Sequence, residues 1–226
     1  LATTAGTIAL NDNVTNNAFI VDKLKNEGAL ILGKTNLSEW AYYFCNNCPS
    51  GYSAQGGQTL NPYGRKIFDS GGSSSGSGAA ISANFSSVSL GSETSGSILS
   101  PSSANSIVGL KPTIGLVSRS GIVPISSTLD TSGPMTKNVI DNAIVLKAIS
   151  GYDQNDNMSV SVDSIDLESI INSSLKGKRF GVFKDYLNDS LYLNAINKII
   201  KLGGTTVEFS PPKVDFSGFR KILDYD

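Results

Sequence analysis

Residues 70–103 constrain the fold of this chain most strongly, because they hold 15 serines in 34 positions. From residue 70 to residue 110 there is a single charged side chain, Glu93. A flexible Ser/Gly linker has a similar composition but does not need a recurring set of apolar residues. Here such a set is present: Ala79, Ala80, Ile81, Ala83, Val88, Leu90, Ile98, Pro101, Ile107, Val108 and Leu110. We therefore predict two glycine-rich turns, residues 71–77 and 91–97, each lying beside a buried helix or strand.

Turns of this kind bring serine hydroxyls and main-chain N–H groups together in a dry interior. A phosphate-binding loop requires Gly-Lys-Ser/Thr and a dinucleotide site requires GxGxxG after a strand, and neither motif is present. The run from Gly91 to Ser97 does not fit a GxSxG elbow. The chain also contains no histidine, which removes the usual general base. A serine nucleophile activated by lysine is the chemistry that remains.

Charge and hydropathy exclude several classes of partner. Lys+Arg total 18 and Asp+Glu total 19, a net charge of −1, so we predict no nucleic-acid partner. The apolar residues 29–33 lie between Glu27 and Lys34 and fall far short of the roughly 20 apolar residues of a membrane span. We predict no membrane span. The spacing of Cys45 and Cys48 is compatible with half a zinc site, a redox dithiol, a disulfide or two loop residues.

Hydrophobic periodicity indicates alternating helices and strands in much of the chain. We expect helices over residues 16–28, 37–43, 136–150 (capped by Thr136) and 191–202 and from 215 onward, and strands over residues 29–32, 107–110, 179–183 and 205–209. Residues 46–69 are expected to be mostly loop. This order of elements predicts an α/β fold.

The run GGSSSGSGAAISANFSSVSLGSETSGSILSPSS resembles the signature of the amidase-signature hydrolases. ALILGKTNLSEWA, GGQTLNP, IVGLKPTIGLVSRSGIVPIS and DTSGPMTKNVIDNAIVLKAISG are similar to flanking blocks of that family, in order from about residue 3 to residue 152. The turns are most similar to the peptide-amidase-like group. The resemblance implies a three-layer α/β/α sandwich with a central mixed β-sheet. It also implies that residues 1–226 are a single incomplete domain, with the signature core in 1–152 and a following β/α segment in 153–226.

The resemblance also implies a Ser-Ser-Lys triad. Ser97 corresponds to the nucleophile and Ser73 to the bridging serine, which follows a cis peptide bond in the family. Main-chain N–H groups of Thr94, Ser95, Gly96 and Ser97 correspond to the oxyanion hole. The family lysine lies just before the block that reads ATTAG here, so it is expected upstream of Leu1, and the chain is expected to be an internal portion of an amidase. Lys34 and Lys111 match other positions of the family.

The implied activity is hydrolysis of a carboxamide through an acyl-enzyme on Ser97, without a cofactor or a metal. Many family members carry Arg where this chain has Leu99, so we expect a small neutral amide or a peptide C-terminal amide as substrate. Two alternatives remain open. One is a catalytically incomplete fragment or non-catalytic paralogue, and the other is the A-type subunit of an amidotransferase with a stable partner.

Three further expectations concern residues near the serine turns. Glu93 is expected to accept hydrogen bonds from neighbouring amides. Asp130 is expected to cap a turn at Ser132 and Gly133. Trp40 and the aromatic residues 42–44 are expected either to line a wall of the site or to pack in the core.

Overall fold

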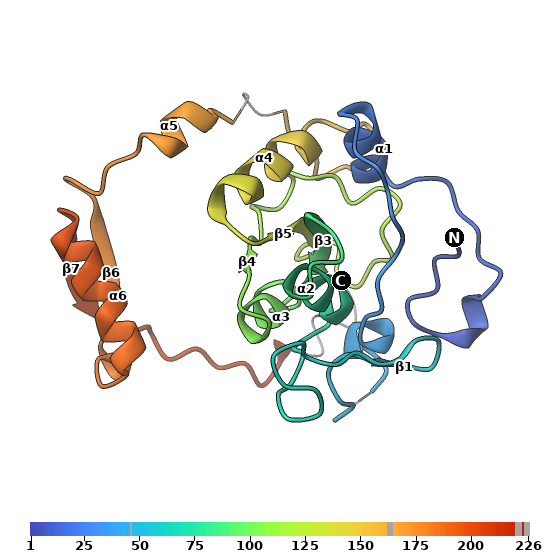
Figure 1. Ribbon diagram of the computed structural model, residues 1–226, viewed down its shortest axis with the longest axis horizontal. Helices are drawn as coiled ribbons and strands as arrows, with labels where there is room; N and C mark the ends of the chain where they lie inside the picture. The colour runs from blue at the N-terminus through green and yellow to red at the C-terminus, as the bar shows by residue number, and fades with distance from the viewer. Residues whose placement is uncertain (46, 162–164, 220–222, 224–226) are drawn as a thin grey trace. The chain divides into compact units, whose positions relative to one another are not determined.

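A computed structural model describes residues 1–45, 47–161, 165–219 and 223. The chain forms two compact units, Leu1–Ile165 and Asp166–Tyr225. Both contain helices and strands (Figure 1), so the predicted α/β class is confirmed. Among the described residues, no helix combines the length and the apolar character needed to cross a bilayer.

The larger unit is organised around a three-stranded antiparallel sheet. Its strands, in spatial order, are β3 (Val88–Glu93), β5 (Thr131–Thr136) and β4 (Val108–Gly109). All six residues of the central strand β5 are buried, which requires cover on both faces of the sheet. Helix α4 (Val139–Ile149) lies on one side of the sheet, and α2 (Ser75–Ser82) and α3 (Leu99–Ala104) lie on the other (Figure 1).

Small residues let α2 approach its neighbours closely. A Cβ atom at Gly76 would lie 2.4 Å from the carbonyl oxygen of Asn36, which leaves no room for a side chain. Of the two predicted glycine-rich turns, the first, residues 71–77, is a loop that runs directly into α2. In the second, residues 91–97, positions 91–93 belong to β3.

Helix α1 (Phe19–Asn26) packs against α4. The buried core beside these two helices consists of Ile20, Val117, Val145 and Ile149. This apolar cluster uses residues from three distant parts of the sequence, and it fixes α1 and α4 against each other.

Three local predictions for the larger unit are wrong. Residues 29–32 are not a strand: Leu30 is 87% exposed, and no strand of the described residues pairs with this segment. Thr136 ends β5, and Asn138 caps α4 by accepting the N–H of Asp141 at 2.8 Å. Thr136 cannot act as the cap because strand pairing with Val88 holds it in the sheet. The predicted helix at 37–43 is a short 3₁₀ turn, η2 (Glu39–Tyr42).

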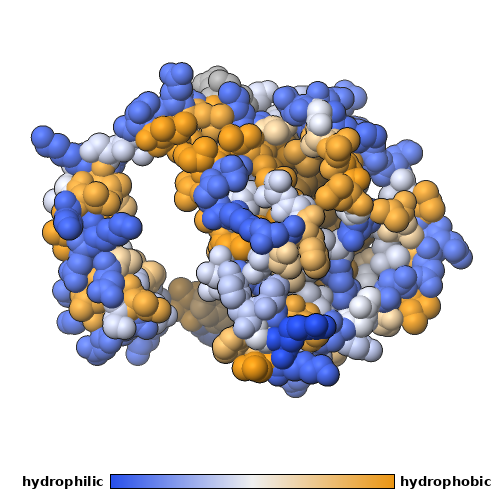
Figure 2. All heavy atoms as spheres, viewed as in Figure 1, coloured by the Kyte–Doolittle hydropathy of each residue, from blue (hydrophilic) through white to orange (hydrophobic). Residues whose placement is uncertain are grey.

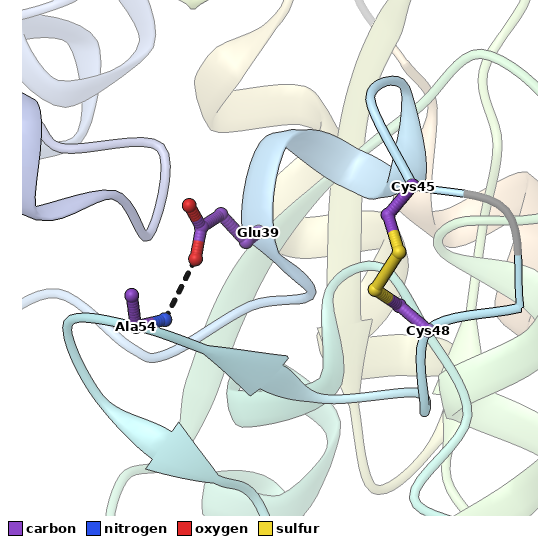
Figure 3. The surroundings of a disulfide bond; sticks show 4 residues. All are labelled: Glu39, Cys45, Cys48 and Ala54. Atoms are coloured by element: carbon purple, nitrogen blue, oxygen red, sulfur yellow. Dashed lines mark hydrogen bonds between the residues drawn. A yellow bond between two sulfur atoms is a disulfide. The ribbon is translucent and has the colours of Figure 1, made fainter.

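Residues 47–69 are mostly loop, as expected, with one short antiparallel pair formed by β1 (Tyr52–Ser53) and β2 (Gly57–Gln58). The Cys45 and Cys48 sulfurs form a disulfide at one end of this region (Figure 3). Nearby, the Glu39 carboxylate accepts the N–H of Ala54 at 2.7 Å and joins η2 to the loop (Figure 3). The part of the chain that is described contains no group of three His, Cys, Asp or Glu side chains suited to a metal.

The smaller unit is a β/α/β arrangement at the predicted positions. Strands β6 (Arg179–Phe183) and β7 (Thr205–Phe209) are parallel, and α6 (Ser190–Lys201) connects them. Apolar side chains are exposed among hydrophilic ones on the visible face of this unit (Figure 2). Leu191 of the same unit is 78% exposed. The helix expected from residue 215 falls largely on residues 220–222 and 224–226, which lie outside the described part of the chain. The described residues also form three short elements, η1 (Ile8–Leu10), α5 (Leu167–Ile171) and η3 (Lys184–Tyr186).

Candidate active site

Ser97 lies in a turn, residues 94–98, that connects the end of β3 to the start of α3. Gly96 in this turn has a φ of +81°, a conformation that favours glycine because it has no Cβ. The chain therefore bends immediately before Ser97, within the glycine-rich turn predicted over residues 91–97. Ser97 itself is partly exposed.

The Glu93 carboxylate holds this turn from inside. Glu93 is 4% exposed. One carboxylate oxygen accepts the N–H of Gly96 at 2.7 Å, and the other accepts those of Ile98 at 2.7 Å and Leu99 at 3.0 Å. A buried carboxylate without such donors would be costly, whereas three main-chain N–H groups compensate its charge. The prediction that Glu93 accepts hydrogen bonds from the surrounding amides is confirmed.

The same bonds divide the main-chain donors of the turn into two groups. The N–H of Gly96 is engaged by Glu93. The N–H groups of Thr94, Ser95 and Ser97 have no acceptor among the described residues. These three groups remain available to an oxygen atom of a ligand.

Ser73 lies in the loop before α2, and the peptide bond between Gly72 and Ser73 is cis. Ser73 is 3% exposed. Its carbonyl oxygen accepts the N–H groups of Ser38 at 3.0 Å and Ser75 at 2.8 Å. Its hydroxyl has no hydrogen-bond partner within the described ranges, so this buried polar group is not used to hold the fold together.

The residue after Ser73 joins the two serine segments. The main-chain N–H of Ser74 donates to the carbonyl oxygen of Ser97 at 3.1 Å. The Ser74 hydroxyl oxygen lies 3.2 Å from both the carbonyl oxygen and the nitrogen of Ser92, near the end of β3. The structure thus brings the segments of Ser73 and Ser97 into direct main-chain contact. Across the described residues, no hydrogen bond links the two hydroxyl groups to each other.

A cavity of about 1260 Å³ opens beside this contact. Its wall includes Ser73, Ser74, Glu93 and Thr94, but not residues 95–97. Part of the remaining wall is aromatic or comes from the loop before β5: Trp40, Tyr43, Phe44, Ile122, Val123, Pro124, Ile125, Ser126 and Ser127. Of the aromatic residues named from the sequence, Trp40, Tyr43 and Phe44 therefore line the cavity.

Lys34 also lines the cavity but does not contact the serines in this structure. Its ammonium group donates to the carbonyl oxygens of Leu1 and Ala2, each at 3.2 Å, and to the hydroxyl of Thr3. Lys111 is not part of the cavity wall. Among the described residues, neither lysine forms a hydrogen bond with Ser73 or Ser97.

The role predicted for Asp130 is wrong. Ser132 and Gly133 lie within β5 rather than in a turn, so there is no turn there to cap. Instead, one Asp130 oxygen accepts the N–H of Ile125 at 2.7 Å and that of Ser126 at 3.0 Å, while the other accepts the Thr94 hydroxyl. Thr94 and Asp130 are 36 positions apart, so local sequence patterns do not reveal this contact.

An ion pair at the cavity wall was not predicted from the sequence. Arg119 and Asp156 form a bidentate contact, with Nη2 and Nε of Arg119 at 2.5 and 3.0 Å from the two carboxylate oxygens. Hydrogen bonding from Arg119 lowers the pKa of Asp156 to about 2, although burial opposes the shift. The pair therefore anchors the loop that follows Arg119 to the segment around Asp156.

Known proteins are similar to this chain in sequence and in architecture. The profile of the family described as Amidase matches residues 1–218. A probable amidase of Arabidopsis thaliana is 47% identical over 188 residues, which are 80% of this chain and 36% of that protein. The A-type subunit of the glutamyl-tRNA(Gln) amidotransferase from Staphylococcus aureus (strain bovine RF122 / ET3-1) is 42% identical over 204 residues, covering 87% of this chain and 41% of that protein.

Solved structures give the same result for the fold. Native peptide amidase from Stenotrophomonas maltophilia superposes with a TM-score of 0.87 and 43% identity, covering 94% of this chain and 45% of that one. The α/β amidase-signature fold inferred from the resemblance is thus confirmed by similarity. In place of one central mixed sheet, the described residues form an antiparallel sheet in the larger unit and a parallel pair in the smaller unit. The chain spans less than half the length of each of these three relatives.

Proposed function

This chain belongs to the amidase family, and from that premise we propose that the protein containing it hydrolyses a carboxamide through an acyl-enzyme on Ser97. The observation that carries the proposal is the hydrogen bond from the Ser74 N–H to the Ser97 carbonyl oxygen. It joins the segment of Ser73, whose hydroxyl has no hydrogen-bond partner among the described residues, to a turn whose N–H groups at Thr94, Ser95 and Ser97 likewise have no acceptor there. These are the parts that serine-based acyl transfer needs: a nucleophile, a proton relay and an anion site.

In the proposed reaction, the Ser97 oxygen attacks the amide carbonyl carbon and forms the new C–O bond. The Ser97 proton passes to Ser73, whose own proton passes to a lysine base. The resulting oxyanion accepts hydrogen bonds from the N–H groups of Thr94, Ser95 and Ser97, while Gly96 shapes the turn. The C–N bond then breaks as the nitrogen takes the proton held by the lysine and leaves as ammonia or an amine. Water then gives a proton to the same base, attacks the acyl carbon and releases the acid, while Ser97 regains its proton.

We assign the base to a lysine on the N-terminal side of Leu1, within the same amidase domain as residues 1–226. Two observations support this assignment. Lys34 is engaged by the main chain at Leu1 and Ala2, and Lys111 lies off the cavity. A chain of residues 1–226 is accordingly expected to show little amide turnover.

The proposed substrate is a neutral amide, with a peptide C-terminal amide as the first class to test. The exposed Leu99 supports this, because an apolar side chain two positions after the nucleophile offers no charged group to a substrate carboxylate. The aromatic residues Trp40, Tyr43 and Phe44 give the cavity an apolar wall for a peptide side chain. Similarity to the Stenotrophomonas maltophilia peptide amidase favours the same class.

A second candidate is the A-type subunit of an amidotransferase, which the 42% identity to the Staphylococcus aureus protein favours. It predicts that the protein co-purifies with another subunit in a stable complex. A non-catalytic paralogue is the third candidate, and it predicts no reactive serine.

A fluorophosphonate probe tests the proposal in the full-length protein. The serine oxygen bonds to phosphorus while fluoride leaves, so labelling reports an activated nucleophile. We expect labelling of Ser97, its loss in Ser97→Ala, and normal labelling in Ser100→Ala, because Ser100 is an exposed neighbour on α3. Labelling that persists in Ser97→Ala would move the nucleophile elsewhere. Release of ammonia from an N-acylated dipeptide amide then tests the substrate class.

A further inference from the structure

Thr94 and Asp130 extend the β3–β5 ladder by one pair of side chains. Glu93 ends β3 and pairs with Thr131, the first residue of β5. Thr94 follows the first strand and Asp130 precedes the second, so antiparallel pairing makes them the next facing residues. At this step the Thr94 hydroxyl donates to the Asp130 carboxylate. The sheet thereby ends in a side-chain contact at the residue where the 94–98 turn begins.

The Asp130 carboxylate connects this turn to the cavity wall. One oxygen binds the Thr94 hydroxyl, and the other accepts the N–H groups of Ile125 and Ser126. Thr94, Ile125 and Ser126 all line the cavity. Charge-assisted hydrogen bonds are roughly twice as strong as neutral ones, so the carboxylate holds both segments in one arrangement.

We propose that Asp130 is a positioning residue that fixes Thr94 for stabilisation of the oxyanion. The inference rests on the proposed function, in which the Thr94 N–H is one of the donors. The Glu93 carboxylate restrains the later part of the turn through the N–H groups of Gly96, Ile98 and Leu99. The Asp130 contact is the side-chain restraint at the first donor of the turn.

This role has a kinetic signature that general stabilisation of the fold lacks. A donor aimed at the oxyanion matters most when negative charge develops, so its displacement raises the barrier and leaves ground-state binding nearly unchanged. We expect kcat to fall by roughly tenfold to a hundredfold with KM changed by less than about threefold.

The experiment uses the full-length protein, four single variants and the double variant Thr94→Val/Asp130→Asn. Thr94→Val and Asp130→Asn each weaken the contact, Thr94→Ser keeps the hydroxyl, and Asp141→Asn makes the same carboxylate-to-amide change at the start of α4. Each variant is assayed for ammonia release from an N-acylated dipeptide amide. Each is also assayed for inhibition by the matching trifluoromethyl ketone, which forms a tetrahedral oxyanion adduct with a serine.

We expect Thr94→Val and Asp130→Asn to lower kcat and to raise the ketone inhibition constant by similar factors. The double variant is expected to lose no more than the worse single variant, because both changes remove one contact. Thr94→Ser should retain most of the wild-type kcat, and Asp141→Asn should match the wild type. If Asp130→Asn does not fold, the pair Thr94→Val and Thr94→Ser makes the same comparison.

Other outcomes overturn the inference. Unchanged kcat in Thr94→Val and Asp130→Asn, or a loss confined to KM, would show that the contact does not position an oxyanion donor. If the kinetic prediction fails while fluorophosphonate labels Ser97 in the wild-type protein, this inference is overturned and the proposed function stands. If the wild-type protein is not labelled at Ser97 at all, the proposed function fails and this inference fails with it.

Discussion

The buried carboxylate of Glu93 accepts the main-chain N–H of Gly96 at a distance of 2.7 Å. This contact fixes the residue before Ser97 and sets which donors of the 94–98 turn stay available. Both partners belong to the same chain segment, so the contact orients the N–H groups of the turn before a ligand binds. Preorganised donors of this kind lower a barrier because they need not reorient as charge develops.

Glu93→Gln tests this organisation. Glutamine offers one acceptor oxygen, so at least one of the N–H groups of Gly96, Ile98 and Leu99 must face an amide NH₂ group. We expect a loss of about 1–3 kcal/mol in the free energy of unfolding and a lower kcat. Urea denaturation and ammonia release measure these effects, with Glu168→Gln on the exposed part of α5 as control. Wild-type stability in Glu93→Gln would contradict the prediction.

Gly96→Ala tests the backbone conformation of the turn. Gly96 has a φ of +81° and Gly28 a φ of +84°, and a Cβ atom at either position would meet no atom within 4 Å. Both substitutions are therefore expected to cost roughly 1–2 kcal/mol of stability from backbone strain. Only Gly96→Ala should also lower kcat, by about tenfold or more, because its turn carries the proposed oxyanion donors. Equal activity of the two variants would contradict the prediction.

Asp156→Asn tests the ion pair with Arg119 through pH dependence. The pKa of Asp156 is lowered to about 2, so the unfolded chain binds more protons in acid, and the pair contributes stability that is complete above about pH 4. This contribution is lost as the pH falls from about 4 toward about 2. We expect Asp156→Asn to lower the free energy of unfolding by on the order of 2 kcal/mol near pH 6, with a smaller difference in acid.

Urea denaturation at a series of pH values from about 3 to about 6 measures this convergence. Asp12→Asn, at an exposed carboxylate of the same unit, serves as the control. A difference between Asp156→Asn and wild type that stays constant with pH would show that the Arg119 contact is not the source of the stability.

Reduction of the Cys45–Cys48 disulfide by a dithiol is expected to lower stability modestly. The two cysteines are three positions apart, and the chain-entropy treatment assigns roughly 2 kcal/mol to so short a loop. Because Tyr43 and Phe44 line the cavity directly before Cys45, we also expect KM to rise. Thiol titration and thermal denaturation check this, with the double variant Cys45→Ser/Cys48→Ser as a form that does not respond to the reductant. Two titratable thiols in the unfolded protein before any reductant is added would contradict the disulfide.

Several parts of the fold could be predicted because they depend on neighbouring residues. The strands β6 and β7 and the helix between them follow from local hydrophobic periodicity, which the short connections of a β/α/β unit preserve. The bend at Gly96 was predictable because few residues other than glycine adopt its φ. The role of Glu93 was predictable because a lone charge in an uncharged segment must find donors nearby.

Other parts depend on residues that are far apart in the chain. Residues 29–32 have the composition of a buried strand, yet a strand forms only where a partner strand supplies hydrogen bonds, and no such partner is found in the described part of the chain. Asp130 was assigned to a nearby turn because sequence patterns favour local partners, whereas its actual donors include Thr94 across the sheet.

The amino-acid order by itself determined the chemical inventory: serine hydroxyls, small residues around them, one acidic side chain among them and no imidazole. The tertiary structure decided which of these groups meet. Pairing of β3 with β5 places Thr94 opposite Asp130, within hydrogen-bond distance. The hydrogen bond from the Ser74 N–H connects the loop before α2 to the carbonyl oxygen of Ser97. The physical reason is that such contacts depend on the register and packing of elements that are distant in the sequence, which no local propensity encodes.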